Sequence, residues 1–561
     1  MTLSLGPTPF SFLPSPSSTV KGTIAAVTDS TMKGVGQIIT GGGTNHVMAF
    51  CDGTNWTVAP GNDSWFSIVV DRLNFLPLQP HSDFSAWTYT HSGLGIAAAV
   101  TSPDGIPAPQ KLICDNTTNV HSTISPIILR QFGNVGFTAF AQPVPWRYAQ
   151  FVRADGITSC QLTLTDGTNG ATATFDLNLG IVITPATAFG SGWTAVSQGI
   201  TPFGGGWYRC YVDAIGAAAG NATINFQVQS QITLGTGSFA GDGVSGIDLW
   251  RASVMPIHAW DLTSRVFFDD FNSLSTIDVN NTKAPGFNWY VNNKWPSGTF
   301  PYNTIVPTQS VDYSLQNSVL TLLLDRSGFG HVMNAAVDNG SGGFNGSAFQ
   351  PPFLLECRAN WASSLVVGTE HSQQVPGLWS QPTAQVTNAT APALVHFDLM
   401  RGTPGAIGAR STIPSIQVVD VGTGGSNPAQ MGSELIGEEP FNVAWQSPNF
   451  SRFYRYSFLW LTYAQAQLSG GAFGFMAWFL DGVYQCTEMN YSPTTIAAPP
   501  TNANNHIGAF MPGETQRHML ILAAGVQPSG FNVVSSGGWP NNGPPSLQPW
   551  NCNFDWVAVY Q

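Results

Sequence analysis

The chain consists of short runs of β-branched and aromatic residues that glycine, proline and Asp-Gly turns interrupt, and no window combines 3.6-residue apolar periodicity with helix caps. Segments 161–165 (QLTLT) and 173–177 (ATFDL) alternate apolar and polar side chains, which is the period of a strand with one face in a core. A length of 561 residues is enough for about three domains. We therefore predict an all-β protein with several domains.

Net charge and the lack of long apolar runs argue against nucleic-acid binding and membrane insertion. Charged residues make up 9% of the chain, against roughly 25% in an average soluble protein. The formal net charge of −12 argues against nucleic-acid binding, which needs a basic footprint. No apolar run of about 18 residues is present, so we expect no membrane insertion. A surface that relies on hydroxyls and amides is typical of virion proteins, adhesins and secreted glycan binders.

The cysteines indicate neither a metal site nor a disulfide framework. All seven stand singly, without CxxC spacing, which excludes zinc-ribbon sites. An odd number fits reduced, buried thiols, and residues 1–7 lack the basic and apolar regions of a signal peptide. We expect synthesis in the cytoplasm, release by lysis, and no cofactor or metal ion.

A series of landmarks runs through residues 259–561. In this order they resemble those of glycoside hydrolase family 16, the laminarinase-like enzymes, and that resemblance implies a concanavalin A-like jelly roll. The landmarks are 267–272 (FFDDFN), 353–358 (FLLECR), 376–379 (PGLW), 453–460 (FYRYSFLW), 479–483 (FLDGV), 536–540 (SGGWP) and 554–561 (FDWVAVYQ).

The catalytic strand of that family reads Glu-x-Asp-x-x-Glu, and here the resemblance aligns it with His396, Asp398 and Arg401. Positions i and i+2 of a strand share a face, whereas i+5 points away, so a one-residue bulge must bring the last residue to the same face. A retaining glycosidase needs two carboxyl groups roughly 5 Å apart. Only Asp398 remains acidic, so the motif is degenerate.

The two substituted positions remove the chemistry. Arg401 stays protonated, with a pKa above roughly 12, so it cannot act as the acid/base. His396 lacks the negative charge that stabilises an oxocarbenium-like transition state. Three interpretations stay open: a charge-satisfied patch around Asp398, a trio that still binds a sugar, and an active site with a relocated carboxylate. The candidates for relocation are Glu356, Glu370, Glu434, Glu438 and Glu439.

Aromatic residues divide into two groups. A tryptophan or tyrosine face is a natural platform for sugars. Trp295, Trp379 and Trp539 lie in Pro/Gly-rich stretches that match cleft-lining loops of the hydrolase family, so they join the trio as candidate glycan-binding residues. We expect Trp87, Trp207, Trp250, Trp460 and Trp556 to be core residues instead. The family sometimes holds a structural calcium, for which Asp555 is the candidate.

Two modules precede the hydrolase-like region. Residues 20–58 hold short β runs broken by Gly and Asp-Gly turns, and they resemble a small antiparallel module of phage tail and fibre proteins. Residues 84–256 resemble a carbohydrate-binding-like jelly roll of tailed-phage structural proteins. We predict an attachment or connector unit over 1–80, a jelly roll over 81–258 and a concanavalin A-like sandwich over 259–561.

Together these resemblances predict a bacteriophage virion component: a tail fibre, adhesin or capsid decoration that displays glycan-binding sandwiches for host attachment without catalysis. Its expected partners are other virion proteins, a host-surface glycan and further copies of the chain, with a trimer as the guess. One alternative is a virion-borne endo-glycanase that cleaves host polysaccharide. A second is an architectural virion protein that binds no sugar.

Overall fold

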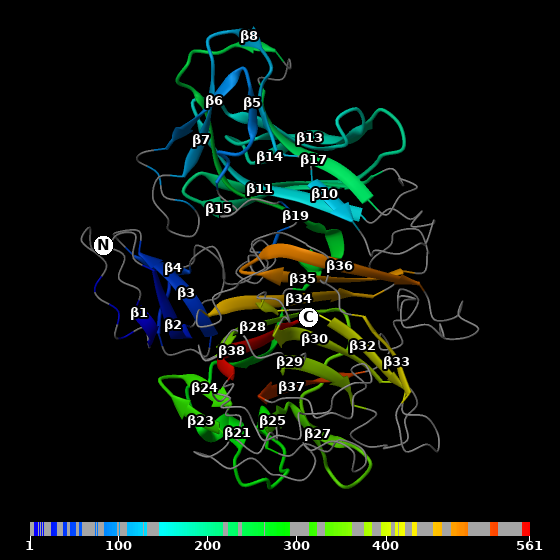
Figure 1. The fold of residues 1–561 in the computed structure, drawn as a ribbon. Coiled ribbons are helices and arrows are strands. Elements are labelled where there is room, and N and C mark those ends of the chain that lie inside the picture. Colours follow the sequence, from blue (N-terminus) through cyan, green and yellow to red (C-terminus); the bar gives the residue numbers. More distant parts are fainter. Residues whose placement is uncertain are drawn as a thin grey trace. The chain divides into compact units, whose positions relative to one another are not determined.

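The fold is that of a computed structural model (Figure 1). The residues that the structure describes are almost entirely β. Their two named helices are short 3-10 helices, η2 (Ile257–Asp261) and η3 (Leu274–Thr276). No helix there is long and apolar enough to cross a membrane. The structure describes residues 5–8, 11, 13, 15, 24–30, 38–41, 45–51, 55–58, 73–74, 76, 83–97, 100, 102, 109–126, 128–131, 145–216, 223–233, 238–262, 264–291, 313–322, 331–361, 375–383, 394–404, 410–412, 415–420, 429–434, 453–462, 473–491, 517–524 and 552–561.

The chain divides into two compact units. The first comprises residues 1–130 and 138–264, and the second comprises 131–137 and 265–561. The first unit contains both the N-terminal sheet and the jelly roll, and the second contains the hydrolase-like sandwich. Each unit is described by itself below.

The first unit begins with a small four-stranded sheet in the order β1-β2-β3-β4. Its apolar side chains form a core of their own, in which Ala49, Cys51 and Trp56 are buried. Strands β2, β3 and β4 pair antiparallel, as expected for residues 20–58, and β1 adds to β2 in parallel. The strands are β1 (Leu5–Thr8), β2 (Ile24–Ser30), β3 (Asn45–Cys51) and β4 (Trp56–Val58).

A single buried side chain, that of Asn74, connects the segment after this sheet to the jelly roll. The Asn74 Nδ2 atom donates to the carbonyl oxygen of Ala252, and its Oδ1 atom accepts from the backbone N–H of Val254. Both partners belong to β19 (Gly246–Pro256). The segment is therefore fixed to the jelly roll by a side chain that satisfies two backbone groups at once.

The jelly roll of the first unit consists of a seven-stranded and a six-stranded antiparallel sheet, counted over the described residues. The sheets face each other: the Tyr148 hydroxyl on β11 lies 2.7 Å from the Ser230 hydroxyl on β17. The seven-stranded sheet contains β14 (Ile181–Phe189), β13 (Gly170–Asp176), β12 (Ser159–Thr165), β17 (Thr223–Ile232), β9 (His121–Ile124) and β5 (Thr88–Thr90), with β10 (Ile128–Gln131) beside β17. The six-stranded sheet contains β15 (Thr194–Gly204), β16 (Trp207–Ile215), β11 (Pro145–Asp155), β19, β7 (Gln110–Cys114) and β6 (Ser92–Ile96); β8 (Thr118–Asn119) and β18 (Phe239–Ala240) form a separate pair.

The second unit is a β-sandwich made of an eight-stranded and a nine-stranded sheet in its described part (Figure 1). The C-terminal strand β38 lies between β24 and β28, so the end of the chain completes the eight-stranded sheet. That sheet contains β23 (Tyr313–Gln316), β24 (Val319–Leu322), β38 (Cys552–Tyr560), β28 (Phe353–Trp361), β34 (Tyr454–Leu461), β35 (Phe473–Leu480) and β36 (Val483–Tyr491), with β20 (Arg265–Asp269) beside β38. The nine-stranded sheet contains β21 (Ile277–Asp278), β22 (Trp289–Tyr290), β25 (His331–Asn334), β37 (His518–Ala524), β29 (Val375–Pro382), β30 (Leu394–Pro404), β32 (Ser415–Asp420) and β33 (Ala429–Glu434), with β31 (Arg410–Thr412) beside β30; β26 (Ala336–Asp338) and β27 (Phe344–Gly346) form a hairpin.

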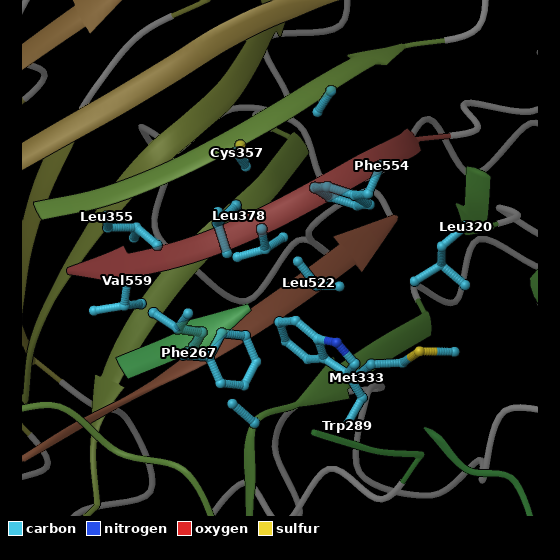
Figure 2. Close-up of a cluster of buried hydrophobic side chains, with 14 of the residues drawn as sticks. Phe267, Trp289, Leu320, Met333, Leu355, Cys357, Leu378, Leu522, Phe554 and Val559 are labelled. Carbon is cyan, nitrogen blue, oxygen red and sulfur yellow. The ribbon is translucent and has the colours of Figure 1, made fainter. Parts of the chain in front are cut away.

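One apolar cluster fills the space between these two sheets (Figure 2). Leu355 and Cys357 of the eight-stranded sheet and Leu378 and Leu522 of the nine-stranded sheet belong to it, and all four are fully buried. Because strand residues alternate between faces, these positions identify the core side of each sheet. They are the reference for placing every other residue of the sandwich.

The buried thiols match the sequence expectation. Among the described residues, six cysteines are free and buried: Cys51, Cys114, Cys160, Cys210, Cys357 and Cys552. Burial raises the pKa of the Cys357 and Cys552 thiols, so both stay protonated at neutral pH. They act as small apolar side chains in the core.

Candidate functional site

The three predicted site residues lie on β30, in the interior of the nine-stranded sheet. On β29, Trp379 stands directly opposite Asp398. On the other side, β32 places Ser415 opposite Asp398 and Gln417 opposite His396. The trio is therefore flanked on both sides by neighbouring strands.

The ladder between β29 and β30 contains the predicted bulge. Pro376 pairs with Arg401, Leu378 with Met400 and Trp379 with Asp398, with a register shift on each side of the Leu378 pair. Leu399 therefore has no partner in the ladder, and on β29 the same is true of Gly377 within these described strands. Asp398 and Arg401 are consequently two rungs apart, which places them on one face of the sheet.

Leu378 shows which face this is. It belongs to the core and pairs with Leu522, another core residue. The rungs on either side of it alternate to the opposite face. We call this the outer face of the nine-stranded sheet; Trp379, His396, Asp398 and Arg401 lie on it by register.

Alternation along β30 and β32 assigns their positions to the two faces, and the apolar pair Leu394 and Val419 shares the outer face with the polar positions. The core-side positions are Val395, Phe397, Ile416 and Val418, whereas the outer-face positions beside the trio are Ser415 and Gln417. On β33, Ser433 pairs with Gln417 and extends the polar row. Sequence reasoning missed these three neutral residues, although the alternation over 415–418 (SIQV) was a usable signal.

Glu356, the first candidate for a relocated carboxylate, lies in the other sheet. Its neighbours Leu355 and Cys357 face the core, so Glu356 faces away from the nine-stranded sheet. It is fully buried there, and Oε1 accepts a hydrogen bond of 2.9 Å from the Ser457 hydroxyl. The Arg455 Nε atom lies 3.6 Å from the same oxygen. This carboxylate is a structural partner of Ser457 and Arg455.

The remaining candidate carboxylates do not join Asp398 either. Glu434 pairs with Ile416, and this rung is on the core side of the sheet. Asp420 has the same parity on β32 and also falls on the core side. Glu370, Glu438 and Glu439, together with Trp295 and Trp539, lie outside the described residues. Within the described parts of β29, β30, β32 and β33, Asp398 is the one acidic residue that register places on the outer face; Asp278, at the far edge of the sheet on β21, shares that face because its neighbour Ile277 is in the core.

Asp555, the candidate calcium ligand, forms an ion pair with Arg358. Arg358 also lies over the ring of Phe453, 5.0 Å from its centroid. The carboxylate thus has a protein cation as its partner. No group of three metal-ligating side chains occurs among the described residues.

The jelly roll of the first unit has its own charged row on the face of the six-stranded sheet opposite to Tyr148, beside the apolar cluster of Phe151 and Trp250. Arg153 on β11 pairs in register with Asp248 on β19, which pairs with Lys111 on β7. The Arg153 Nε atom donates to Asp248 Oδ2 at 2.7 Å, and Lys111 forms an ion pair of 2.7 Å with Asp155. Asp248 is fully buried, and this burial raises its pKa to about 6, against the opposing effect of Arg153.

The tryptophans expected in the core are mostly there. Trp87, Trp207, Trp250 and Trp460 are buried, and Trp207 and Trp250 form a cluster with Phe151 and Phe203. Trp556 is different: it pairs with Arg358, on the side of β28 away from the core, and is half-buried. The expectation for Trp556 was wrong because the alternation of β38 places Val557 and Val559 in the core instead.

On the described strands, register places Trp379, His396, Asp398 and Arg401 on one face, and Asp398 is the one acidic residue of the three motif positions. An arginine cannot exchange a proton in turnover. Hydroxyl and amide side chains beside a carboxylate and an aromatic ring are the groups that recognise sugar hydroxyls and sugar faces.

No family model matches the chain, and no curated protein matches it either. Solved structures with similarity to about half of the chain include glycanases and a pseudo-glucanase. An endo-acting O-glycanase from the human gut microbiota is 15% identical, over 53% of this chain and 99% of its own, with a TM-score of 0.28. An immunostimulatory antigen and pseudo β-1,3-glucanase of Mycobacterium tuberculosis is 16% identical, over 53% and 98%, with a TM-score of 0.28. The κ-carrageenase of Pseudoalteromonas carrageenovora is 12% identical, over 52% and 92%, with a TM-score of 0.29. These values assign neither a family nor an activity to the chain.

Proposed function

We propose that the chain is a structural component of a bacteriophage virion that attaches to a host-surface glycan and does not cut it. The observation that carries the binding part is the outer face of the nine-stranded sheet, where register gathers Trp379, His396, Asp398 and Arg401. The virion part is supported by the low content of charged residues and by the sequence resemblance of the first two modules to phage proteins.

The absence of turnover follows from the charges at that face. The positions of the nucleophile and the acid/base in the resembled motif are occupied by His396 and Arg401, and neither is a carboxylic acid. Glu356 and Glu434, the described candidates for replacement, lie on other faces. A glycan held at Asp398 would therefore meet one carboxylate where hydrolysis uses two.

The attachment part is tested with the purified full chain and polysaccharide from the host surface, immobilised for surface plasmon resonance. We expect saturable binding that weakens on Asp398→Asn and on Trp379→Ala. Asn178→Ala, at an exposed position of the first unit, is the matched control and should bind as the unsubstituted chain does. Equal binding by all four proteins would contradict a site on the outer face.

The virion part is tested by labelling intact particles with antibody against the chain and imaging them. Label on the tail or capsid surface supports the proposal, and its absence from purified particles contradicts it. Label on the surface without any glycan binding would instead support the architectural alternative.

A further inference from the structure

The outer face of the nine-stranded sheet differs in charge from the acidic motif it resembles. The motif of the resembled family has three acidic residues where this chain has His396, Asp398 and Arg401. The formal charge of these three positions is therefore about zero instead of −3, and it is more positive when the His396 imidazole is protonated. This inference rests on the proposed function, because it concerns the ligand of the same face.

No second acid falls on the outer face within the described parts of β29, β30, β32 and β33. Glu434 and Asp420 have core-side parity on β33 and β32. The neighbours of the trio on the outer face, Ser415, Gln417 and Ser433, are neutral. Arg401 therefore has one carboxylate, that of Asp398, two rungs away, whereas Asp278 is on β21 at the far edge of the sheet.

The net negative charge of the chain makes the cationic residue Arg401 unusual at this face. It contains 19 Lys and Arg residues against 31 Asp and Glu, with a net charge of −12, so the protein as a whole repels anions. An anionic ligand must be held by local contacts. A guanidinium group forms paired, charge-assisted hydrogen bonds with carboxylate and sulfate oxygens, and these are stronger than neutral ones.

We propose that the outer face binds an acidic glycan, with Arg401 receiving a carboxylate or sulfate group of the sugar and Asp398 and Trp379 receiving its hydroxyl groups and ring face. The competing arrangement is an internal pair in which Arg401 neutralises Asp398. A face neutralised in that way has no preference between acidic and neutral sugars.

The test uses the full chain and three oligosaccharides of equal length, measured by isothermal titration calorimetry. They are a neutral β-1,3-glucan, its sulfated derivative and a hexuronate oligomer, and the last two distinguish the sources of negative charge. We expect one acidic probe to bind about tenfold more tightly than the neutral one. Raising the salt concentration should reduce this preference, since screening weakens exposed charge interactions.

Arg401→Gln should remove the preference for the acidic probe over the neutral one. Arg410→Gln is the matched control. Arg410, on β31, pairs with Pro404 of β30, and Pro404 lies on the opposite face of the sheet from Arg401 by register. Arg410→Gln should keep the preference.

Equal affinity for neutral and acidic probes would overturn this inference and leave the proposed function intact. A preference that survives Arg401→Gln would overturn it in the same way. Binding to none of the probes and not to host polysaccharide would overturn the proposed function itself. Circular dichroism of each variant distinguishes a lost contact from a lost fold.

Discussion

Arg401 and Asp398 lie on one face of the nine-stranded sheet although three positions separate them, because Leu399 is left out of the ladder between β29 and β30. The bulge expected of a Glu-x-Asp-x-x-Glu strand is present, and the residues on either side of it are Asp398 and Arg401.

Two adjacent residues of β29 test the assignment of faces. Leu378→Ala removes a fully buried core side chain, and we expect the free energy of unfolding to fall by about 3 kcal/mol. Trp379→Ala, on the outer face, should change it by less than about 1 kcal/mol and should weaken glycan binding. Urea unfolding and surface plasmon resonance measure the two effects. Large destabilisation by Trp379→Ala with little effect of Leu378→Ala would reverse the assignment.

Asn74→Ala tests the attachment of the N-terminal segment to the jelly roll. The change removes the partners of the Ala252 carbonyl and the Val254 N–H, and both groups are buried. We expect a loss of about 2 kcal/mol in the free energy of unfolding and faster proteolysis between the four-stranded sheet and β5. Asn178→Ala, at an exposed position, is the control. Unchanged proteolysis would show that other contacts hold the segment.

The raised pKa of Asp248 predicts how the stability of the fold changes with pH. Burial raises its pKa from 3.8 to about 6, Arg153 and Lys111 oppose the rise, and Asp155 adds to it. Between these pH values the native state binds more protons than the unfolded state, so this group makes stability fall as pH rises from about 4 to about 6. Asp248→Asn should remove that part of the dependence.

The measurement is the urea midpoint of both proteins at pH 4.5 and 6.5. The substituted chain should gain stability relative to the unsubstituted one at the higher pH. A difference that is the same at both pH values would show that Asp248 does not titrate in this range.

The fold class could be predicted because it depends on short-range patterns. Alternation in 161–165 predicted β12, and alternation of the same kind places Leu378 and Trp379 on opposite faces. Motif spacing predicted the bulge near Leu399, since residues at i and i+5 share a face only with an extra residue between them.

Long-range contacts could not be predicted in the same way. The hydrogen bonds of Asn74 to β19 span 178 and 180 residues, and nothing near Asn74 in the sequence indicates its partner. The parallel pairing of β1 with β2 depends on how the connecting segment returns, which the strand pattern does not encode. Trp556 was placed in the core by its hydrophobicity, but the parity of β38 decides its face.

The same limit applied to the candidate site. The three substituted positions were found from a local motif, whereas Ser415 and Gln417 become neighbours of the trio only through the pairing of β30 with β32. Excluding Glu356 from the candidate site also required the structure, because only the core cluster shows that Glu356 faces away from the nine-stranded sheet.

The central claim is that the outer face binds a glycan without cleaving it. The most direct measurement is the number of new reducing ends after prolonged incubation of the full chain with the host polysaccharide that it retains. We predict no increase over polysaccharide alone, for the unsubstituted chain and for Asp398→Asn. New reducing ends that accumulate with the unsubstituted chain and disappear on Asp398→Asn would contradict the claim and identify an active glycanase.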